Sequence, residues 1–378
     1  MKISIIGPVY PYRGGISHYT FHLNRAIQNL GHSTQIISFH RQYPGWLYPG
    51  KNDLDPSQVK LSSDAIFVLD PFKPWTWYKA IHLITNWDPD LIVIQWWTTF
   101  WGIPFSIINK KLNSLGYRVI YLIHNVLPHE ERSWDRFLTK ISLYKGHFFI
   151  VQSPREQERL RTLLPKASAI LHAHPIYPAF STHKLSKIEA RRRLKVPVDI
   201  PLLLFFGIVR PYKGLRVLIE ALGTLRNRGA VPNLMVAGEF WENVNDYKKL
   251  IERFELNEQV FIENRYIPNE EVELFFSAAD IMVAPYVGGS QSGAASLALA
   301  NDLPLIVSQQ IAEGIKLTHK KKVWTYSSNN VLELADTIQE LLGQLDQINF
   351  SGEKYVDEWI EMAEILVMCA TNSKLLPL

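Results

Sequence analysis

Short apolar runs alternate with amphipathic stretches along the chain, in two successive series. The first series opens with the run Lys2–Ile6, followed by a glycine-containing loop and a stretch of helical periodicity, Ser17–Leu30. Gly31 stands directly after this stretch, where helices commonly end in glycine. Further strand-like runs follow at Thr34–Phe39, Ala65–Leu69, Leu91–Ile94, Val119–Ile123 and Phe148–Val151. Helices are predicted between several of them, at Trp75–Trp87 and Pro104–Leu115.

The second series repeats this pattern. The run Leu202–Phe206 leads through a loop into the helical stretch Leu215–Arg226. More strand-like runs follow at Leu234–Ala237, Val260–Ile262, Ile281–Ala284 and Leu305–Val307. Strands of β-branched and aromatic residues that alternate with helices indicate a parallel sheet covered by helices on both faces. The chain is therefore predicted to be an α/β protein of two Rossmann-like, doubly wound lobes that face a central cleft.

A polar stretch with prolines marks the boundary between the two lobes. It holds Pro175, Pro178 and the run Ser181–Ser186. We therefore expect an N-terminal lobe over residues 1–178 and a C-terminal lobe over residues 179–355. The length of 378 residues also fits two domains.

Charge divides unevenly between the two halves. The formal total is +4, but residues 1–180 hold 19 Lys and Arg against 11 Asp and Glu, whereas residues 181–378 hold 21 against 25. The first half also holds 8 of the 11 Trp and 10 of the 12 His. This asymmetry predicts lobes with different partners, the basic one suited to an anionic partner. The alternative is a chance division of charge.

The chain has one cysteine, Cys369, which cannot form an internal disulfide or a thiolate metal cluster. A reducing, cytoplasmic environment is therefore expected. The sequence shows no secretory leader and no run of about 20 apolar residues. Contact with a membrane is accordingly expected to be peripheral at most.

Gly14 and Gly15 follow the first strand-like run. Paired glycines let a ligand approach the backbone, and the helix N-terminus behind them offers unpaired N–H groups to an anion. The full Gly-x-Gly-x-x-Gly fingerprint is absent, which argues against a nicotinamide cofactor. The alternative is a tight turn between strand and helix.

The segment Gly207–Gly214 carries a more specific signal. Arg210 and Lys213 leave the end of a strand three positions apart. Two cations near a helix start can clamp a diphosphate and neutralise a leaving group without a metal. The alternative is an exposed basic loop.

The run Ser290–Gly293, whose middle residues are Gln291 and Ser292, opens a further predicted helix. Backbone N–H groups at such a start are suited to a phosphate or a sugar hydroxyl. The alternative is a simple helix N-cap formed by one of the two serines.

Polar residues also follow a strand of the first lobe. His124 and Asn125 come directly after Val119–Ile123, and His129 lies in the same loop. A histidine at a strand end can hydrogen-bond a substrate hydroxyl or move a proton. The alternative is a structural histidine that satisfies loop backbone.

Trp96 and Trp97 open an aromatic-rich segment that continues to Phe105. Such residues suit sugar stacking or a lipid-facing surface; the alternative is that they belong to the core. Together with the positive charge of this half, they suggest a partner on a polyprenyl diphosphate at the inner face of the cytoplasmic membrane.

No metal ion and no cofactor are predicted. The sequence contains no EF-hand loop, P-loop or Gly-x-Ser-x-Gly elbow. Asp88-Pro89-Asp90 has alternating carboxylates, but its proline sits at an ordinary turn between helix and strand, so we interpret it as structural.

Together these motifs resemble those of the GT-B glycosyltransferases, specifically the retaining family 4 (group 1) type, over nearly the whole chain. Gly14-Gly15 resembles the family's loop after the first strand, and His124 its strand-end histidine. Gly207–Gly214 is similar to the pattern Gly-Arg-x-x-x-x-Lys-Gly. Further similar segments are Gly238-Glu239, Ala279–Tyr286 and Leu303–Ser308.

The resemblance implies a nucleotide diphosphate sugar as donor, held mainly by the second lobe, and an acceptor in the first. Arg210 and Lys213 would take the diphosphate. The residues assigned to donor binding are Gly14, Gly15, Gly207, Glu239, Tyr266, Ile267, Ser290, Gln291, Ser292 and Gly293, with Tyr266 and Ile267 near the base. Those assigned to the acceptor side are Trp96, Trp97, Asn125 and His129. The final helix, about residues 356–378, would pack back on the first lobe.

The sequence departs from the family pattern at two positions. The family usually carries two glutamates eight positions apart after its Pro-Tyr pair, and the aligned residues here are Gly289 and Leu297. A subgroup has a Gln-Ser-Gly loop instead, which Gln291–Gly293 resembles. We therefore expect an active enzyme in which amide, hydroxyl and backbone donors replace the missing carboxylates.

The predicted activity is metal-independent transfer of a hexose, with retention, from a nucleotide diphosphate sugar to a glycan or lipid-linked glycan in cell-surface polysaccharide synthesis. Arg210, Lys213 and His124 would be the catalytic residues, with His124 positioning the sugar or the acceptor. Two alternatives remain open: an inert nucleotide-sugar-binding protein and a GT-B nucleotide-sugar epimerase. Nucleic acid is not expected as a partner, because no arginine-rich strip or RNP-like motif is present.

Overall fold

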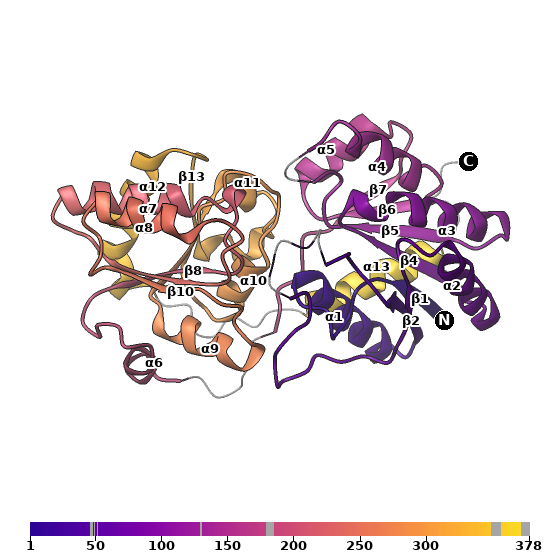
Figure 1. Ribbon diagram of the computed structural model, residues 1–378, viewed down its shortest axis with the longest axis horizontal. Coiled ribbons are helices and arrows are strands. Elements are labelled where there is room, and N and C mark those ends of the chain that lie inside the picture. The colour runs from indigo at the N-terminus through magenta and orange to yellow at the C-terminus, as the bar shows by residue number, and fades with distance from the viewer. Residues whose placement is uncertain are drawn as a thin grey trace. The chain divides into compact units, whose positions relative to one another are not determined.

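The computed structural model describes residues 1–45, 48, 50, 52–128, 131–178, 185–348 and 357–371. These residues form two compact units (Figure 1). Unit 1 comprises Met1–Asp55, Lys60–Pro175 and Tyr355–Leu378, and unit 2 comprises Pro56–Val59 and Ile176–Lys354, so far as each range is described.

Unit 1 is built on a parallel sheet. Within the described residues its strand order is β3-β2-β1-β4-β5-β6-β7. The strands are β1 (Lys2–Ile6), β2 (Ser33–Phe39), β3 (Ala65–Leu69), β4 (Leu91–Trp96), β5 (Val119–Ile123), β6 (Phe148–Val151) and β7 (Ala169–Leu171). The helices are α1 (Gly15–Asn29), α2 (Pro74–Trp87), α3 (Gly102–Ser114), α4 (Asp135–Leu143), α5 (Pro154–Leu163) and α13 (Glu358–Thr371), with a short 3-10 turn η1 (Thr99–Trp101).

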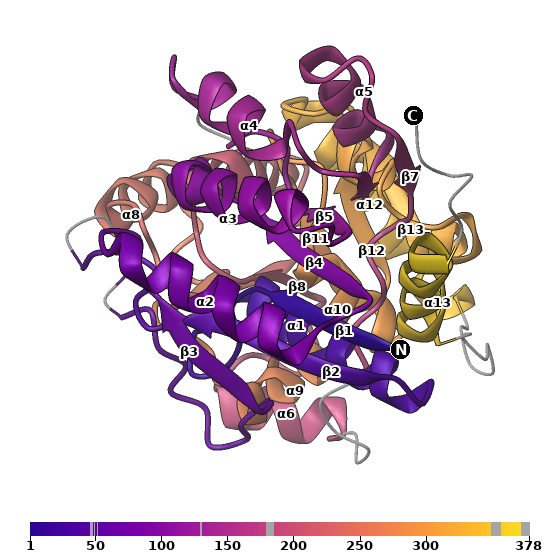
Figure 2. The same ribbon diagram turned by 90° about the vertical axis from the view of Figure 1, so that its right-hand side faces the viewer.

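Helices cover both faces of this sheet. The central strands β4, β5 and β6 are buried along their whole length, which is why their sequences are almost continuously apolar. Because crossovers between parallel strands are right-handed, α1 lies on the opposite face from α2, α3, α4 and α5. Figure 2 shows α2, α3 and α4 side by side, and α13 packs against α1.

The C-terminal helix α13 is held by buried side chains. Trp359, Met362 and Leu366 lie on its buried face. The Trp359 ring meets the Tyr19 ring of α1 edge-on, with 4.8 Å between the ring centres. The last helix of the chain therefore belongs to the hydrophobic core of unit 1.

Unit 2 repeats the design on a second parallel sheet. Its strand order within the described residues is β10-β9-β8-β11-β12-β13. The strands are β8 (Leu202–Phe206), β9 (Asn233–Ala237), β10 (Val260–Glu263), β11 (Ile281–Ala284), β12 (Leu305–Ser308) and β13 (Val323–Tyr326). The helices are α6 (Lys187–Leu194), α7 (Leu215–Asn227), α8 (Val244–Arg253), α9 (Asn269–Ala278), α10 (Gly293–Ala300), α11 (Gln309–Ala312) and α12 (Val331–Gln344), and the 3-10 turns are η2 (Pro211–Lys213), η3 (Leu317–Lys322) and η4 (Leu345–Gln347).

Four residues from the first half of the chain pack with unit 2. The Ser57 hydroxyl accepts a hydrogen bond from the Asn269 N–H at 2.9 Å, and the Gln58 N–H donates to the Glu270 carboxylate at 3.0 Å. The segment Pro56–Val59 is thereby fixed to the start of α9. The lobe expected over residues 1–178 therefore does not include this segment, which belongs to unit 2 although it lies in the first half of the sequence.

Among the described residues, none of the helices combines the length and the apolar character that a membrane crossing needs.

Candidate functional site

The loop after β8 is fixed on both sides at the carboxyl edge of the unit 2 sheet. On one side the Val209 N–H donates to the Glu239 C=O, 2.9 Å away, in the turn after β9. On the other side the Tyr212 C=O accepts from the Val287 N–H at 2.8 Å, in the loop after β11. Since parallel strands end at the same edge of their sheet, these three loops form one platform. Glu239 itself is buried there.

Lys213 lies within this platform, half-buried. Its Nζ is 5.6 Å from the centre of the Tyr286 ring. A Cβ built on Gly207 would lie 3.2 Å from the same Nζ, so the ammonium group rests over a residue without a side chain. Burial lowers the pKa of Lys213, and the positive charge of Arg210 also lowers it. An ammonium group in such surroundings is stabilised by an incoming anion.

The Arg210 guanidinium lies close to two aromatic rings. Its Cζ is 5.4 Å from the centre of the Tyr212 ring and 5.5 Å from that of the Trp241 ring. Aromatic contacts of this kind orient a guanidinium, whose N–H groups match the oxygens of a phosphate. The structure thus brings together the two cations that the sequence pairs.

The run Ser290–Gly293 meets the same platform through Tyr286. The Ser292 hydroxyl donates to the Tyr286 hydroxyl at 2.9 Å and accepts from the Ala295 N–H at 3.1 Å, and so it caps α10. Burial raises the pKa of Tyr286 to about 12, so its hydroxyl keeps its proton at neutral pH. Tyr286 therefore connects the ammonium group of Lys213 to the start of α10.

The remaining residues assigned to the donor lie in the loops after β10 and β11. Ser290 is fully buried, and its Oγ has no hydrogen-bond partner within the part of the chain that the structure describes. A buried hydroxyl in this state is stabilised by any polar group that reaches it. Gln291, Gly293 and Tyr266 are half-buried, and Ile267 is buried.

The two positions that lack the family's glutamates differ in their surroundings. Gly289 has a φ of +93°, a backbone conformation that favours glycine. Leu297 lies among the buried residues of α10 and is only 9% exposed. A glutamate is therefore disfavoured at the first position by backbone strain and at the second by burial of its charge.

In unit 1, His124 is held by a chain of hydrogen bonds. Its Nε2 lies 2.9 Å from Gln95 Oε1, and the Gln95 amide donates to the Thr20 hydroxyl at 2.6 Å. The Thr20 hydroxyl donates in turn to the Ile16 C=O at 2.9 Å. This order of donors assigns the His124 proton to Nε2. Burial lowers the pKa of His124 to about 3, so the ring is neutral at neutral pH.

Gly14 and Gly15 stand at the start of α1, beside this hydrogen-bond chain. The Gly14 C=O accepts from the N–H groups of Ser17 and His18, at 3.1 Å and 3.3 Å. Asn125, also assigned to the acceptor side, is half-buried in the turn after β5. His129 lies outside the described residues, so its assignment stays a prediction.

The assignment of Trp96 to the acceptor side is wrong. This residue ends β4, is fully buried, and donates its indole N–H to the Val126 C=O at 3.1 Å. The ring is therefore part of the core and cannot stack on an acceptor sugar. Trp101 is buried in the same core, whereas Trp97 is half-buried and donates to the Tyr43 hydroxyl at 2.7 Å.

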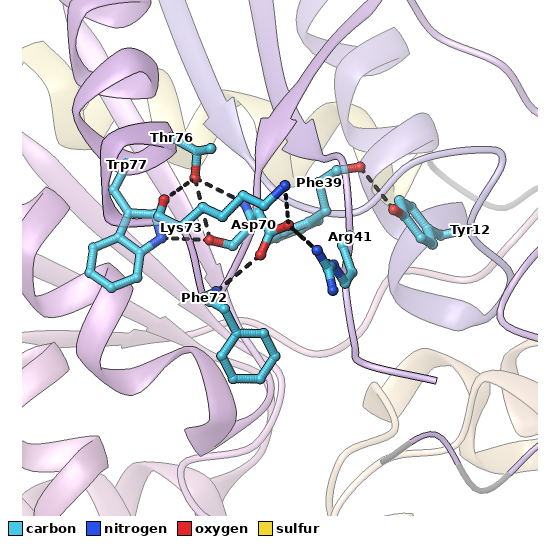
Figure 3. Close-up of polar contacts among 8 residues, drawn as sticks. All are labelled: Tyr12, Phe39, Arg41, Asp70, Phe72, Lys73, Thr76 and Trp77. Carbon is cyan, nitrogen blue, oxygen red and sulfur yellow. Dashed lines mark hydrogen bonds and ion pairs between the residues drawn. The ribbon is translucent and has the colours of Figure 1, made fainter. Parts of the chain in front are cut away.

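A buried carboxylate organises the carboxyl end of β3 (Figure 3). Asp70 accepts from Arg41 Nη2 at 2.7 Å and lies 3.9 Å from Lys73 Nζ. Its other carboxylate oxygen accepts from the Phe72 N–H at 3.0 Å, and its C=O accepts from the Trp77 indole at 2.8 Å. Asp70 itself is fully buried, so it holds two partly exposed cations at this edge of the sheet.

A pocket of about 360 Å³ lies beside Arg41 in unit 1. Its other described walls include Tyr12, His40, Tyr43, Tyr48, Asn52 and Asp53. Aromatic faces suit the apolar face of a sugar, and the amide, carboxylate and guanidinium suit its hydroxyl groups. This pocket is the best candidate for the acceptor side in unit 1.

Acid should weaken unit 1 through His124. The unfolded chain binds a proton on this ring near pH 6.5, whereas the folded protein binds it only near pH 3. The unfolded state therefore holds more protons between these values, and stability falls as the pH falls. From pH 6.5 to 5 we expect a loss of roughly 2 kcal/mol in the free energy of unfolding.

Urea unfolding at pH 7 and pH 5, followed by tryptophan fluorescence, measures this loss. The variant His124→Asn should lose less stability on acidification than the wild type. The control His82→Asn, at an exposed position on α2, should lose as much as the wild type does. Identical losses in all three proteins would count against neutral burial of His124.

Within the described residues, the structure contains no group of three or more His, Cys, Asp or Glu side chains that could hold a metal ion.

Several site residues were not singled out from the sequence. Tyr286 and Trp241 follow strands β11 and β9, and Asp70 follows β3, so their positions after strands could have identified them. Gln95 could have been identified more easily, because a single amide inside a fully buried strand requires polar partners.

Two family models match the chain, one in each half. The model for Glycosyltransferase Family 4 matches residues 13–195, and the model for Glycosyl transferases group 1 matches residues 200–344. The chain is 24% identical over 249 residues to the GDP-mannose:glycolipid 4-beta-D-mannosyltransferase of Xanthomonas campestris pv. campestris. This alignment covers 64% of each protein, which is a little under two thirds of the relative's length.

Solved structures match nearly the whole chain. Sucrose-phosphate synthase from Thermosynechococcus elongatus has a TM-score of 0.68 at 18% identity, covering 97% of this chain and 94% of that one. The Anabaena protein HepE, in complex with UDP and glucose, has a TM-score of 0.68 at 14% identity, covering 97% and 95%. The likeness confirms the predicted fold class, a GT-B fold with two Rossmann-like α/β domains. With a glycosyltransferase model matched in each half, the protein is of the group 1 glycosyltransferase type.

Proposed function

We propose that the protein transfers a hexose from a nucleotide diphosphate sugar to a hydroxyl group of a glycan or glycolipid. The observation that carries this proposal is the platform of unit 2, where Lys213 and Arg210 lie beside the start of α10. Two cations and the N–H groups of a helix start supply positive charge without a metal. This is the arrangement that a departing diphosphate requires.

The chemistry follows from that charge. The acceptor hydroxyl oxygen bonds to the anomeric carbon, the bond between that carbon and the diphosphate oxygen breaks, and the hydroxyl proton passes to the departing diphosphate. Negative charge develops on the diphosphate as its bond to carbon breaks. Lys213 and Arg210 stabilise this charge, while Ser292 holds the N-terminus of α10 toward the same platform. The proposal also assigns Glu239, Tyr266, Ile267 and the run Ser290–Gly293 to donor binding.

Unit 1 supplies the acceptor side in this proposal. His124, whose Nε2 proton is directed to Gln95, positions the sugar or the acceptor in this proposal. The pocket beside Arg41 binds the acceptor sugar. A neutral histidine at this position orients a hydroxyl and does not carry charge to the reaction.

The names of related proteins agree with this substrate class. The Xanthomonas relative is named for GDP-mannose as donor and a glycolipid as acceptor, and HepE is described in complex with UDP-glucose. We extend the class, a nucleotide diphosphate sugar and a glycan or glycolipid acceptor, to this chain. A cytoplasmic role in the synthesis of cell-surface polysaccharide is part of the same proposal.

A thermal-shift screen of nucleotide sugars, followed by turnover assays on the best ligand, tests the function. A ligand that binds only the folded state raises the melting temperature, so the true donor should stand out from other bases and sugars. Transfer to an added glycan acceptor supports the proposal. Binding without turnover would instead favour an inert binding protein, and conversion of the donor without an acceptor would favour an epimerase.

Chelation should leave transfer unchanged. Because Lys213, Arg210 and the α10 start supply the positive charge in this proposal, excess EDTA should not lower the rate of the purified enzyme. A loss restored by Mg²⁺ or Mn²⁺ would contradict the metal-independent part alone.

The anomeric configuration of the product tests retention. The family resemblance supports retention, whereas the name of the Xanthomonas relative specifies a β-linked product. An NMR spectrum of the purified product gives the configuration of the new glycosidic linkage, which should be the same as that of the sugar in the donor. The opposite configuration would show inversion.

A further inference from the structure

Two side chains outside the proposed donor site fix the main chain of Tyr286. The Gln310 amide donates from its Nε2 to the Tyr286 C=O at 2.8 Å, and the Ser328 hydroxyl donates to the same oxygen at 3.1 Å. Gln310 lies in α11 and is half-buried, whereas Ser328 lies in the loop after β13 and is exposed. Because a carbonyl oxygen has two lone pairs, these two donors satisfy the Tyr286 C=O completely.

The topology of the unit 2 sheet brings both donors to Tyr286. Strands β11, β12 and β13 are parallel neighbours, and Ser308, which ends β12, pairs with Tyr326, which ends β13. Gln310 and Ser328 each follow a member of this pair by two positions, and Tyr286 follows the end of β11 by two positions. Corresponding positions beyond adjacent parallel strands meet at the carboxyl edge, where the platform lies.

The rest of Tyr286 faces the residues that are proposed to bind the diphosphate. Its ring centre lies 5.6 Å from Lys213 Nζ, and its hydroxyl accepts from Ser292 at the start of α10. The ring also meets the Tyr212 ring edge-on, with 5.9 Å between the centres. The next residue, Val287, donates its N–H to the Tyr212 C=O. A shift of the Tyr286 main chain therefore moves the surroundings of Lys213 and the start of α10 together.

The loop that begins at Tyr286 has little stiffness of its own. Gly288 and Gly289 follow, and Gly289 has a φ of +93°. Glycines have the greatest conformational freedom to lose on folding, so a glycine-rich loop depends on contacts from outside for a single conformation. Tyr286 itself is only 3% exposed, and a closely packed interior transmits small displacements of such a ring to its neighbours.

We propose that Gln310 and Ser328 are positioning residues for the diphosphate of the donor. By holding the Tyr286 C=O they set the direction of the Tyr286 ring, and through it the place of the Lys213 ammonium group and of the α10 N-terminus. The site is thereby ordered before the donor arrives, which lowers the cost of binding. The inference rests on the proposed function and adds to its donor site two residues that act through Tyr286.

Calorimetric titration of the full chain with nucleoside diphosphates tests the inference. The probes are UDP, GDP, ADP, CDP and dTDP, each compared with its nucleoside, and the wild type should bind at least one of the diphosphates. The variant Gln310→Met/Ser328→Ala removes both donors and keeps most of the side-chain volume. It should weaken binding of that diphosphate about tenfold. Binding of the nucleoside should stay nearly unchanged, because the nucleoside lacks the diphosphate.

Asn330→Ala is the matched control in the same loop. Asn330 stands two positions after Ser328, and its Oδ1 accepts from the Glu333 N–H at 3.1 Å as the N-cap of α12. Both variants lose hydrogen bonds to backbone, so each should melt about 3–5 °C below the wild type. Asn330→Ala should nevertheless bind the diphosphate as the wild type does. Ser328→Thr, which keeps a hydroxyl, should also bind as the wild type does.

A Lys213→Met background separates positioning from a general structural role. In this background the substitution Gln310→Met/Ser328→Ala should change diphosphate affinity by less than about threefold, because the cation that Tyr286 positions is already gone. Equal factors in the two backgrounds would overturn the inference, and so would wild-type affinity in Gln310→Met/Ser328→Ala. If the wild type bound none of the five diphosphates, the proposed function itself would fall, and this inference with it.

Discussion

Replacing Lys213 by methionine should lower kcat/KM for transfer about 100-fold, which corresponds to about 3 kcal/mol of transition-state stabilisation. Methionine keeps the length of the side chain over Gly207 and beside the Tyr286 ring, but it removes the positive charge. The departing diphosphate then lacks the cation that lies beside Tyr286, the residue hydrogen-bonded to the start of α10. Initial rates with saturating acceptor, measured over a range of donor concentrations, give kcat/KM for the donor.

Nucleotide binding makes the same test more specific. Lys213→Met should strongly weaken binding of the matching nucleoside diphosphate. Binding of the nucleoside should stay nearly unchanged, because the nucleoside lacks the negatively charged diphosphate. Lys248→Met, at an exposed position on α8, is the matched control and should behave as the wild type. If Lys213→Met turned over at more than about a third of the wild-type rate, the diphosphate site would be assigned to the wrong residue.

Arg210 contributes to the same site by a different route. Its guanidinium is oriented by the Tyr212 and Trp241 rings, so a lysine in its place would keep the charge and lose the planar contacts. The two cations also affect each other, since Arg210 lowers the pKa of Lys213. A bound diphosphate removes this repulsion, and for that reason the effects of the two substitutions should not add.

The regular elements with strong apolar signals were predictable from the sequence. The strands β5, β6 and β11 coincide with predicted runs, because parallel strands buried by helices are almost continuously apolar. Strand β7 was not expected, because its apolar run Ala169–Leu171 is only three residues long and too short to mark a strand. Helix α5 was missed for a different reason: Glu156 and Leu160 are its only buried residues, and the helix shows no apolar stripe.

The candidate site, too, was predictable only in part from the sequence. Arg210, Lys213 and the run Ser290–Gly293 were predictable because each follows a strand, and parallel strands bring their carboxyl ends to one edge. The role of Tyr286 was not, because it depends on the direction of a ring that meets both Lys213 and Ser292. Trp96 was wrongly assigned to the acceptor because β4 continues two residues beyond the predicted run, into the buried sheet.

Substituting Gly214 by alanine should destabilise unit 2 and reduce transfer together. Gly214 follows Lys213 directly and has a φ of +71°, and a Cβ built on it would lie 2.0 Å from the Pro285 C=O oxygen. The left-handed backbone costs an alanine about 1 kcal/mol, and the clash with backbone adds about 1–3 kcal/mol. For a unit of this size we expect the melting temperature to fall by roughly 10 °C.

Gly229→Ala isolates the effect of the clash from the effect of the backbone angle. Gly229 has a nearly identical φ of +74°, but nothing lies within 4 Å of its built Cβ. Its substitution should lower the melting temperature by only about 3 °C and leave transfer unchanged. Relief of the clash in Gly214→Ala moves the Lys213 backbone, and with it the ammonium group, away from the platform. Transfer assayed well below either melting temperature should therefore fall at least tenfold in Gly214→Ala alone; equal melting temperatures and equal rates in the two variants would show that the contact with Pro285 does not position Lys213.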